Sequence, residues 1–260
     1  MRMWSFLLFC SMLSSAGSFT VSVPSSPLLV VRGETALLSC QFTPDQTLSN
    51  LVINWQREED YRVIHSFYYQ KDQLDRQSKD YLNRTSLFHG ELSKGNASLR
   101  IANIQLNDAG SYLCIVSNSQ GNDRGAVQLV YTAIYSEPRL SIILDPLNVM
   151  MRYETEGYPQ PEVSWRGGGG QELSDNREVS NTSDGGLYYL KSSYVTQNPA
   201  VNLTFTLKNP LAHQEIHRQI TFSYDKDSKS NSSVVILSVL CSVLLISTGF
   251  LLYLQCCKQR

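Results

Sequence analysis

Charge is scarce in this 260-residue chain. Charged residues make up 17% of it and the formal net charge is −1, whereas an average soluble domain has roughly 25% charged residues. No stretch is strongly basic, which argues against nucleic acid as a partner. Two apolar segments, one near each end of the sequence, explain part of the deficit.

The usual signatures of catalytic and cofactor sites are also missing. No Gly-x-Ser-x-Gly nucleophile elbow occurs, and the glycine run at 167–170 lacks the preceding strand and following helix of a phosphate cradle. His213 and His217 have the spacing of two zinc ligands on a helix, but no Glu or Cys constellation surrounds them. We therefore expect no enzyme, with no catalytic residue, metal, cofactor or small-molecule substrate.

Cysteine is sparse, and its placement is informative. Four of the six cysteines lie in or beside the apolar segments: Cys10, Cys241, Cys256 and Cys257. Only Cys40 and Cys114 remain between the segments. Two cysteines in an oxidising compartment should pair, so we expect a Cys40–Cys114 disulfide and no thiol left for an interchain bridge.

The N-terminal apolar segment has the pattern of a secretory signal peptide. Arg2 supplies a positive charge, Trp4 to Leu13 is apolar, and the small residues Ala16-Gly17-Ser18 offer a cleavage site. The apolar stretch is too short to span a bilayer; a buried helix is the alternative. We expect residues 1–18 to be removed, so that the mature chain begins near Phe19.

The C-terminal apolar segment predicts a single transmembrane helix. Residues 234–254 contain no charge and, at about 1.5 Å per residue, they match a hydrocarbon core of roughly 30 Å. A stalk of residues 227–233 precedes this segment, and Lys258 and Arg260 follow it. The positive charges predict a cytoplasmic tail of residues 255–260, hence a single-pass type I protein of the plasma membrane. A removed lipid-anchor signal is the alternative, although such signals end in an apolar tail.

Two kinds of covalent modification are expected. Five sequons lie between the apolar segments and indicate a glycosylated ectodomain, with acceptors Asn83, Asn96, Asn181, Asn202 and Asn231. Cys256 and Cys257 lie at the inner boundary of the expected transmembrane helix, which is a common setting for palmitoylation. Unmodified thiols are the alternative.

Residues 19–133 read as short strands with period-two alternation, which is typical of a β-sandwich. The specific signal is Cys40, then Trp55, then the Asp108-Ala-Gly-Ser-Tyr112-Leu-Cys114 motif. This order is that of an immunoglobulin domain, in which the cysteines bridge the sheets and the tryptophan packs against the bridge. Tyr112 is placed for the tyrosine corner.

Several longer motifs point to one family: Leu38-Ser39-Cys40-Gln41-Phe42, Trp55-Gln56, Val63-Ile64-His65-Ser66-Phe67, Lys71-Asp72-Gln73-Leu74, Asn83-Arg84-Thr85-Ser86-Leu87-Phe88, Gly95-Asn96-Ala97-Ser98-Leu99-Arg100 and Asp108 to Cys114. With these motifs the first domain resembles the variable-type domain of the B7/butyrophilin family of T-cell co-signalling ligands. Variable-type domains often pair an arginine at the position of Arg84 with the motif aspartate. The resemblance therefore implies a structural Arg84–Asp108 ion pair.

Residues 134–226 resemble the constant-type domain of the same family, carried by Glu156-Gly157-Tyr158-Pro159-Gln160-Pro161-Glu162-Val163-Ser164-Trp165. The bridging cysteines are absent, and counting along the resemblance puts Tyr153 and Phe205 in their places. Two rings packed against Trp165 would replace the bridge only in part. We expect an all-β protein of two immunoglobulin-like sandwiches, variable-type then constant-type, the second without a disulfide and less stable. A second region that is no sandwich is the alternative.

A binding face is predicted by alternation in the first domain. If Tyr112 and Cys114 point into the core, their neighbours Leu113 and Ile115 point outward, and exposed aliphatic residues on a sheet suggest a protein-binding patch. A polar, glycine-rich loop over 117–125 should lie beside them. The expected contact residues are Leu113, Ile115, Asn54, Gln56 and Tyr68. Loops or glycans that cover the aliphatic residues are the alternative.

The C-terminal region favours a ligand over a receptor. Residues 255–260 contain no tyrosine, and the apolar segment before them has no charge with which to recruit a signalling adaptor. We expect a T-cell surface receptor as the partner of the variable-type domain. The resemblance implies modulation of T-cell activation, and inhibition because it is nearest to inhibitory members. A cell–cell adhesion molecule of the immunoglobulin superfamily is the alternative.

Overall fold

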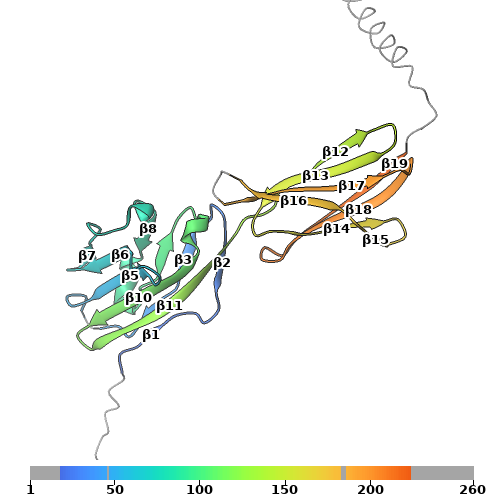
Figure 1. Ribbon diagram of the computed structural model, residues 1–260. Helices are drawn as coiled ribbons and strands as arrows, with labels where there is room; N and C mark the ends of the chain where they lie inside the picture. Colours follow the sequence, from blue (N-terminus) through green and yellow to red (C-terminus); the bar gives the residue numbers. More distant parts are fainter. Residues whose placement is uncertain (1–17, 46, 183–185, 224–260) are drawn as a thin grey trace, which may run out of the picture.

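The computed structural model describes residues 18–45, 47–182 and 186–223. These residues form two β-sandwiches that follow one another along an elongated molecule, the first blue to green and the second yellow to orange in Figure 1. The strong period-two alternation of the sequence produces this all-β architecture, because each strand buries one face and exposes the other.

The first domain packs a six-stranded sheet, in the order β2-β11-β10-β5-β6-β7, against a three-stranded sheet, in the order β3-β9-β8. Its elements are β1 (Val21–Ser22), β2 (Leu28–Val31), β3 (Ala36–Leu38), β4 (Gln41–Phe42), β5 (Val52–Arg57), β6 (Val63–Tyr68), β7 (Lys71–Asp72), the 3-10 helix η1 (Lys79–Tyr81), β8 (Thr85–Leu87), η2 (His89–Lys94), β9 (Leu99–Ile101), η3 (Leu106–Asp108), β10 (Gly110–Asn118) and β11 (Gly121–Thr132). A short β1-β4 pair completes it. Strands β6 and β7 beside β5 are the additions typical of a variable-type domain.

The core of the first domain confirms the predicted disulfide. Cys40 and Cys114 are bonded and fully buried between the sheets. Trp55 is also fully buried, and its Nε1 donates a hydrogen bond to the carbonyl oxygen of Ala97 over 2.9 Å. The indole N–H is thus satisfied inside an apolar core, which removes the cost of burying it unpaired.

The predicted corner beside Asp108 is also present. The Tyr112 hydroxyl donates to the Asp108 carbonyl oxygen over 2.6 Å. The Asp108 carboxylate, in a residue only 3% exposed, accepts hydrogen bonds from the Arg84 guanidinium and from the Gln105 N–H. These contacts fix the turn before β10. Because Arg84 precedes β8 of the three-stranded sheet and Asp108 precedes β10 of the six-stranded sheet, they also link the ends of the two sheets.

The second domain consists of two four-stranded sheets, in the orders β12-β13-β17-β16 and β15-β14-β18-β19. Their strands are β12 (Arg139–Leu144), β13 (Val149–Gly157), β14 (Glu162–Gly167), β15 (Glu172–Leu173), β16 (Asn176–Asn181), β17 (Tyr188–Thr196), β18 (Ala200–Asn209) and β19 (Gln214–Ser223). No disulfide joins these sheets within the described residues. Instead Tyr153 from one sheet meets Phe205 and Trp165 from the other, with ring centroids 4.3 and 5.7 Å apart respectively.

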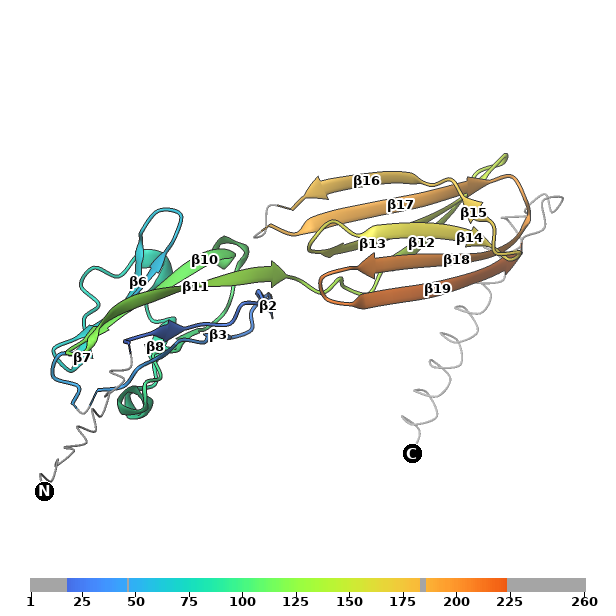
Figure 2. The ribbon, with the colours of Figure 1, turned by 90° about the horizontal axis from the view of Figure 1, so that it is seen from below.

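The two domains touch through a small junction around Asn209, which is 1% exposed. Its Nδ2 donates to the carbonyl oxygens of Ala133 and Tyr158, 3.1 Å away in each case. Leu187 and Tyr158 of the second domain pack against the core of the first. Figure 2 shows β11 running from the first sandwich straight toward this junction.

No helix among the described residues is long and apolar enough to cross a membrane. The expected transmembrane segment, the cytoplasmic tail with Cys256 and Cys257, the sequon Asn231, and all of the expected signal peptide except Ser18 lie outside the described residues.

Candidate functional site

The outward side of the six-stranded sheet collects most of the predicted contact residues. Strand β10 lies between β5 and β11, with Ile115 opposite Asn54 on one side and opposite Arg124 on the other. Leu113 lies opposite Gln56 and Ala126. We call the outward side of β5, β6, β10 and β11 the outer face. Alternation alone therefore identified one continuous surface across neighbouring strands.

Leu113 is on the outer face, but the expectation that it is exposed is wrong. Its exposed fraction is 6%, although it is not part of the core cluster between the sheets. It lies in a hollow whose lining is Glu58, Tyr61, Leu113, Arg124, Gly125 and Ala126. Glu58 and Tyr61 in the turn between β5 and β6, and Arg124 on β11, have longer side chains than leucine and shield Leu113 from water. Ile115, one pair further along the strand, is only partly buried.

The turn between β5 and β6 is fixed by charge. The Glu59 carboxylate accepts a hydrogen bond from the Ser111 N–H over 2.8 Å and another from Arg57 Nε over 3.1 Å. Burial by itself raises the pKa of Glu59, but these hydrogen bonds and the positive charge of Arg57 outweigh it and hold the pKa below its usual range. The ionised carboxylate thus anchors the turn that carries Tyr61 to the rim of the Leu113 hollow.

Asn54 and Gln56 form a prearranged polar row beside the aliphatic residues. The Ser66 hydroxyl donates to Asn54 Oδ1 over 2.9 Å, and Asn54 Nδ2 donates to Gln56 Oε1 over 3.0 Å. All three residues are half-buried. Because the amides are already oriented, a partner that hydrogen-bonds to them loses less side-chain entropy on binding.

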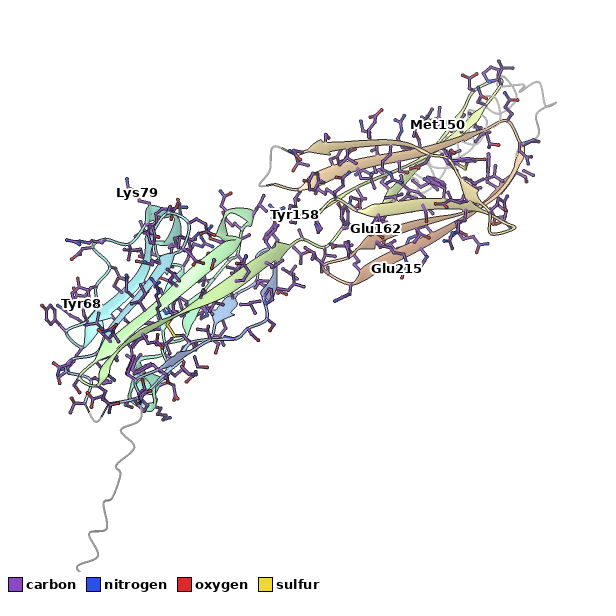
Figure 3. The ribbon with its side chains drawn as sticks, turned by 60° about the horizontal axis from the view of Figure 1, so that its bottom comes forward. Tyr68, Lys79, Met150, Tyr158, Glu162 and Glu215 are labelled. Carbon is purple, nitrogen blue, oxygen red and sulfur yellow. A yellow bond between two sulfur atoms is a disulfide. The ribbon has the colours of Figure 1, made fainter. Side chains whose placement is uncertain are left out.

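Tyr68 lies at the edge of the outer face, as expected. Its ring meets that of Tyr69 edge-on, with centroids 5.3 Å apart, and Tyr69 is 80% exposed. Figure 3 shows Tyr68 projecting from the first domain on the side away from the second. Large, rigid aromatic side chains of this kind are enriched in interface hot spots.

Residues 117–125 do not form the expected loop. Strands β10 and β11 continue through this segment and pair Asn118 with Gly121, which leaves Ser119 and Gln120 as the turn. Gly125 serves close packing, since a Cβ there would lie 2.7 Å from a methyl carbon of Val23. The glycines at 121 and 125 therefore leave room for the N-terminal residues Phe19 to Val23, which pack against β11.

Two contact candidates were missed by sequence reasoning. Tyr61 is 67% exposed at the rim of the Leu113 hollow, and the exposed Arg124 lies directly opposite Ile115. Pairing the two strands outward from the short turn at 119–120 would have placed Arg124 opposite Ile115. The positive φ of Tyr61, 58°, belongs to a tight turn that composition did not reveal.

The sequons of the first domain lie off the outer face. Asn83 is exposed just before β8, and Asn96 just before β9 forms a bridge with Gln41. Strands β8 and β9 belong to the three-stranded sheet. In the second domain, Asn181 on β16 and Asn202 on β18 are exposed. Glycans at Asn83 and Asn96 would therefore cover the opposite side of the first domain and leave the outer face open.

Comparison with known proteins agrees with this architecture. Residues 23–132 match the family model of the immunoglobulin V-set domain, and residues 148–217 match that of the butyrophilin subfamily 3 member A2-like Ig-C domain. The chain is 33% identical over 241 residues to V-set domain containing T-cell activation inhibitor 1 of Mus musculus, covering 86% of this chain and 82% of the relative. The Homo sapiens protein of that name is 35% identical over 211 residues, covering 77% and 72%. The crystal structure of bovine butyrophilin has the same fold, with a TM-score of 0.69 at 23% identity over 80% of this chain and 100% of that chain.

Proposed function

The chain belongs to the B7/butyrophilin family, and from this we propose that it is a cell-surface co-signalling ligand that binds a receptor on T cells and inhibits their activation. In this proposal the first domain makes the contact and the second domain acts as a spacer. Inhibition rests on the similarity to relatives that are named as T-cell activation inhibitors.

The observation that carries the proposal is the composition of the outer face. It combines a half-buried aliphatic residue, Ile115, with the oriented amides of Asn54 and Gln56 and the edge aromatic Tyr68. Specific interfaces have this organisation, with an apolar centre and a polar rim. The sequons on the opposite sheet leave the face accessible to a partner on another cell.

Presentation at the membrane is part of the proposal. The uncharged segment 234–254 has the length of a membrane-spanning helix, and the residues before it carry the two sandwiches. Anchored there, the first domain would be the part of the molecule furthest along the chain from the membrane, which suits contact with an opposing cell.

The direct test is binding of an Fc-fused ectodomain, residues 19–226, to resting and activated T cells, followed by a screen against a library of lymphocyte surface proteins. We expect saturable binding to T cells and reduced proliferation when the fusion is immobilised with a T-cell-receptor stimulus. Absence of T-cell binding, together with clustering of cells that express the full chain, would instead identify an adhesion molecule.

A further inference from the structure

The free end of the second domain carries exposed aliphatic side chains that its core does not use. Four of them are 39–67% exposed: Ile143 (47%), Leu144 (57%), Leu147 (67%) and Val195 (39%). Ile143, Met150 and Val195 lie side by side on adjacent strands, since Ile143 pairs with Met150 and Met150 pairs with Val195. We call these five residues the apolar tip.

The apolar tip is held in a fixed shape. Leu147 lies in the turn between β12 and β13, which is closed by backbone hydrogen bonds from Asp145 N–H to Asn148 and from Asn148 N–H to Asp145, with distances of 2.8 and 3.2 Å. The Leu147 N–H also donates to the Asp145 carboxylate over 3.4 Å. A closed turn that presents its leucine to water leaves apolar area that would be stabilised by a contact outside the domain.

The position of the apolar tip along the chain indicates what covers it. Ser223, the last described residue, pairs with Ala200 at the end of the sheet where β17 ends at Thr196 and β13 begins at Val149. The β12–β13 turn is at this same end of the domain, opposite the junction with the first domain (Figure 2). In Figure 3 the labelled Met150 lies toward this end, and Tyr158 and Glu162 lie toward the junction.

The chain leaves the domain here and reaches the uncharged segment 234–254 after residues 224–233. Fully extended, these ten residues span no more than about 35 Å. We propose that the apolar tip rests in the outer surface of the lipid bilayer in which the chain is anchored. The inference rests on the membrane anchoring in the proposed function and adds a second contact with the same membrane.

The charge pattern above the tip fits a lipid surface better than a second copy of the chain. The next row along the sheet contains Arg152, and the row after it contains Arg139, Glu154 and Lys191. This arrangement puts aliphatic side chains deepest and a guanidinium at the level of the headgroup phosphates. Leu140 and Ile142 are 38% and 40% exposed, but they alternate with Ile143 on β12 and so belong to the other side of the sheet. On the side of the apolar tip the apolar surface ends at the row of Arg152, whereas a stable dimer buries about 800 Å² per partner.

No sequon of the described residues lies on the apolar tip. Asn202 is on the other sheet, and Asn181 pairs with Tyr188 at the junction end of the domain. Asp145 is the one acidic residue of the turn, and residues 145–148 contain no lysine or arginine. The contact is therefore hydrophobic, and it does not require anionic lipid.

The test uses the full chain in phosphatidylcholine nanodiscs with a tryptophan at the tip, Leu147→Trp. Lipids brominated on the acyl chains quench tryptophan only on contact with the bilayer interior. The matched control is Leu37→Trp, because Leu37 on β3 of the first domain is 51% exposed. Trp4 lies in the expected signal peptide, so the chain used begins at Phe19. The two remaining native tryptophans, Trp55 and Trp165, are fully buried and provide a constant background.

We expect brominated discs to reduce the emission due to Leu147→Trp by at least half and to leave Leu37→Trp unchanged. Leu144→Trp provides a second reporter if the first variant does not fold, as judged by its melting temperature. Equal emission from tip and control variants would overturn the inference. T-cell binding by the same discs is measured separately, so that loss of the membrane contact and loss of the proposed receptor function are told apart. A chain that fails to enter the discs would overturn both the anchoring and the contact.

Discussion

The rings of Tyr153 and Phe205 lie 4.3 Å apart between centroids and are inclined by 32°, so the two sheets of the second domain are joined by an aromatic pair. Both residues are almost fully buried, and Trp165 packs against each of them. The Trp165 Nε1 donates to the Ser192 hydroxyl over 2.8 Å, and that hydroxyl donates to Asp175 over 2.6 Å. The sheets are therefore held by packing and a short polar chain.

Truncation of this pair should unfold the second domain selectively. Phe205→Ala removes a ring from a site that cannot refill, and we expect a loss of about 3–5 kcal/mol in its free energy of unfolding. Differential scanning calorimetry of the ectodomain should show the transition of the second domain shifted down. Val195→Ala, at a residue 39% exposed on β17, is the control and should shift it little. Equal effects of the two changes would contradict a packed aromatic core.

The outer face can be probed cleanly at Ile115. We expect Ile115→Asp to weaken T-cell binding by a factor of about 30 or more, since truncating a central interface residue costs about 2 kcal/mol or more. The melting temperature should stay close to that of the unmodified ectodomain. Leu113→Asp is a poorer probe, because Leu113 is 6% exposed and a carboxylate there would be buried.

The control for the outer face is Arg100→Glu, because Arg100 is exposed on β9 of the opposite sheet. Cell-binding titration should give the same affinity for this variant as for the unmodified protein. If Arg100→Glu loses binding and Ile115→Asp keeps it, the receptor contact lies on the three-stranded sheet.

The Arg84–Asp108 ion pair should contribute far more to the free energy of unfolding than the exposed Arg62–Asp80 ion pair. Asp108→Ala leaves the Arg84 guanidinium, whose side chain is 18% exposed, without its carboxylate. Breaking such a buried pair costs about 3–5 kcal/mol. Asp80→Ala breaks the contact with Arg62, in which the side chains are 66% and 44% exposed, and should cost about 1 kcal/mol or less. Urea denaturation of the two variants measures the contrast, and equal losses would argue against a structural role for Asp108.

The Asn209 amide lies at the centre of the domain junction, beside the hydrogen bond from the Thr132 hydroxyl to the Tyr158 carbonyl oxygen. Asn209→Asp keeps the oxygen that accepts from the Leu211 and Ala212 N–H groups but loses the donors to Ala133 and Tyr158. A carboxylate facing two carbonyl oxygens in a buried site should cost about 1–3 kcal/mol or more and loosen the angle between the domains. Small-angle scattering would show a broader distribution of shapes than for Asn198→Asp, an exposed control in the second domain. An unchanged distribution would mean that packing and the remaining hydrogen bonds between Thr132, Ala133 and Tyr158 hold the junction without the Asn209 donors.

Stability should fall at alkaline pH. Burial, then the neighbouring Tyr81, raise the pKa of Tyr112 well above its usual range, and burial raises that of Tyr81. The folded-state pKa values lie above the unfolded value of about 10. Above pH 10 the unfolded chain therefore binds fewer protons than the folded chain, and the free energy of unfolding decreases with rising pH. Below pH 10 these two tyrosines leave the free energy of unfolding unchanged. Denaturation between pH 8 and 11 should show this, with a shallower decline for Tyr81→Phe. A stability that does not change up to pH 11 would contradict the raised values.

Local information in the sequence determined the architecture of this protein. Alternation predicts strands because a pleated backbone points successive side chains to opposite faces, and the order Cys40, Trp55, Tyr112, Cys114 is enough to predict the first core. The family resemblance put Tyr153 and Phe205 at the bridging positions, where their rings are in contact. Alternation put Ile115, Asn54 and Gln56 on one face.

Strand alternation predicts which face of a sheet a residue occupies, but it does not predict which other side chains pack on that face. The burial of Leu113 depends on Tyr61 from a turn more than fifty positions earlier and on Arg124 from the following strand. The role of Gly125 depends on Val23, and that of Asn209 depends on Ala133 and Tyr158. Those neighbours meet only after the chain has closed its long loops, so their positions belong to the tertiary structure. The sequence also did not predict that Leu144 and Leu147 are exposed at the β12–β13 turn. An apolar residue in a sequence does not reveal whether the fold has anything to cover it.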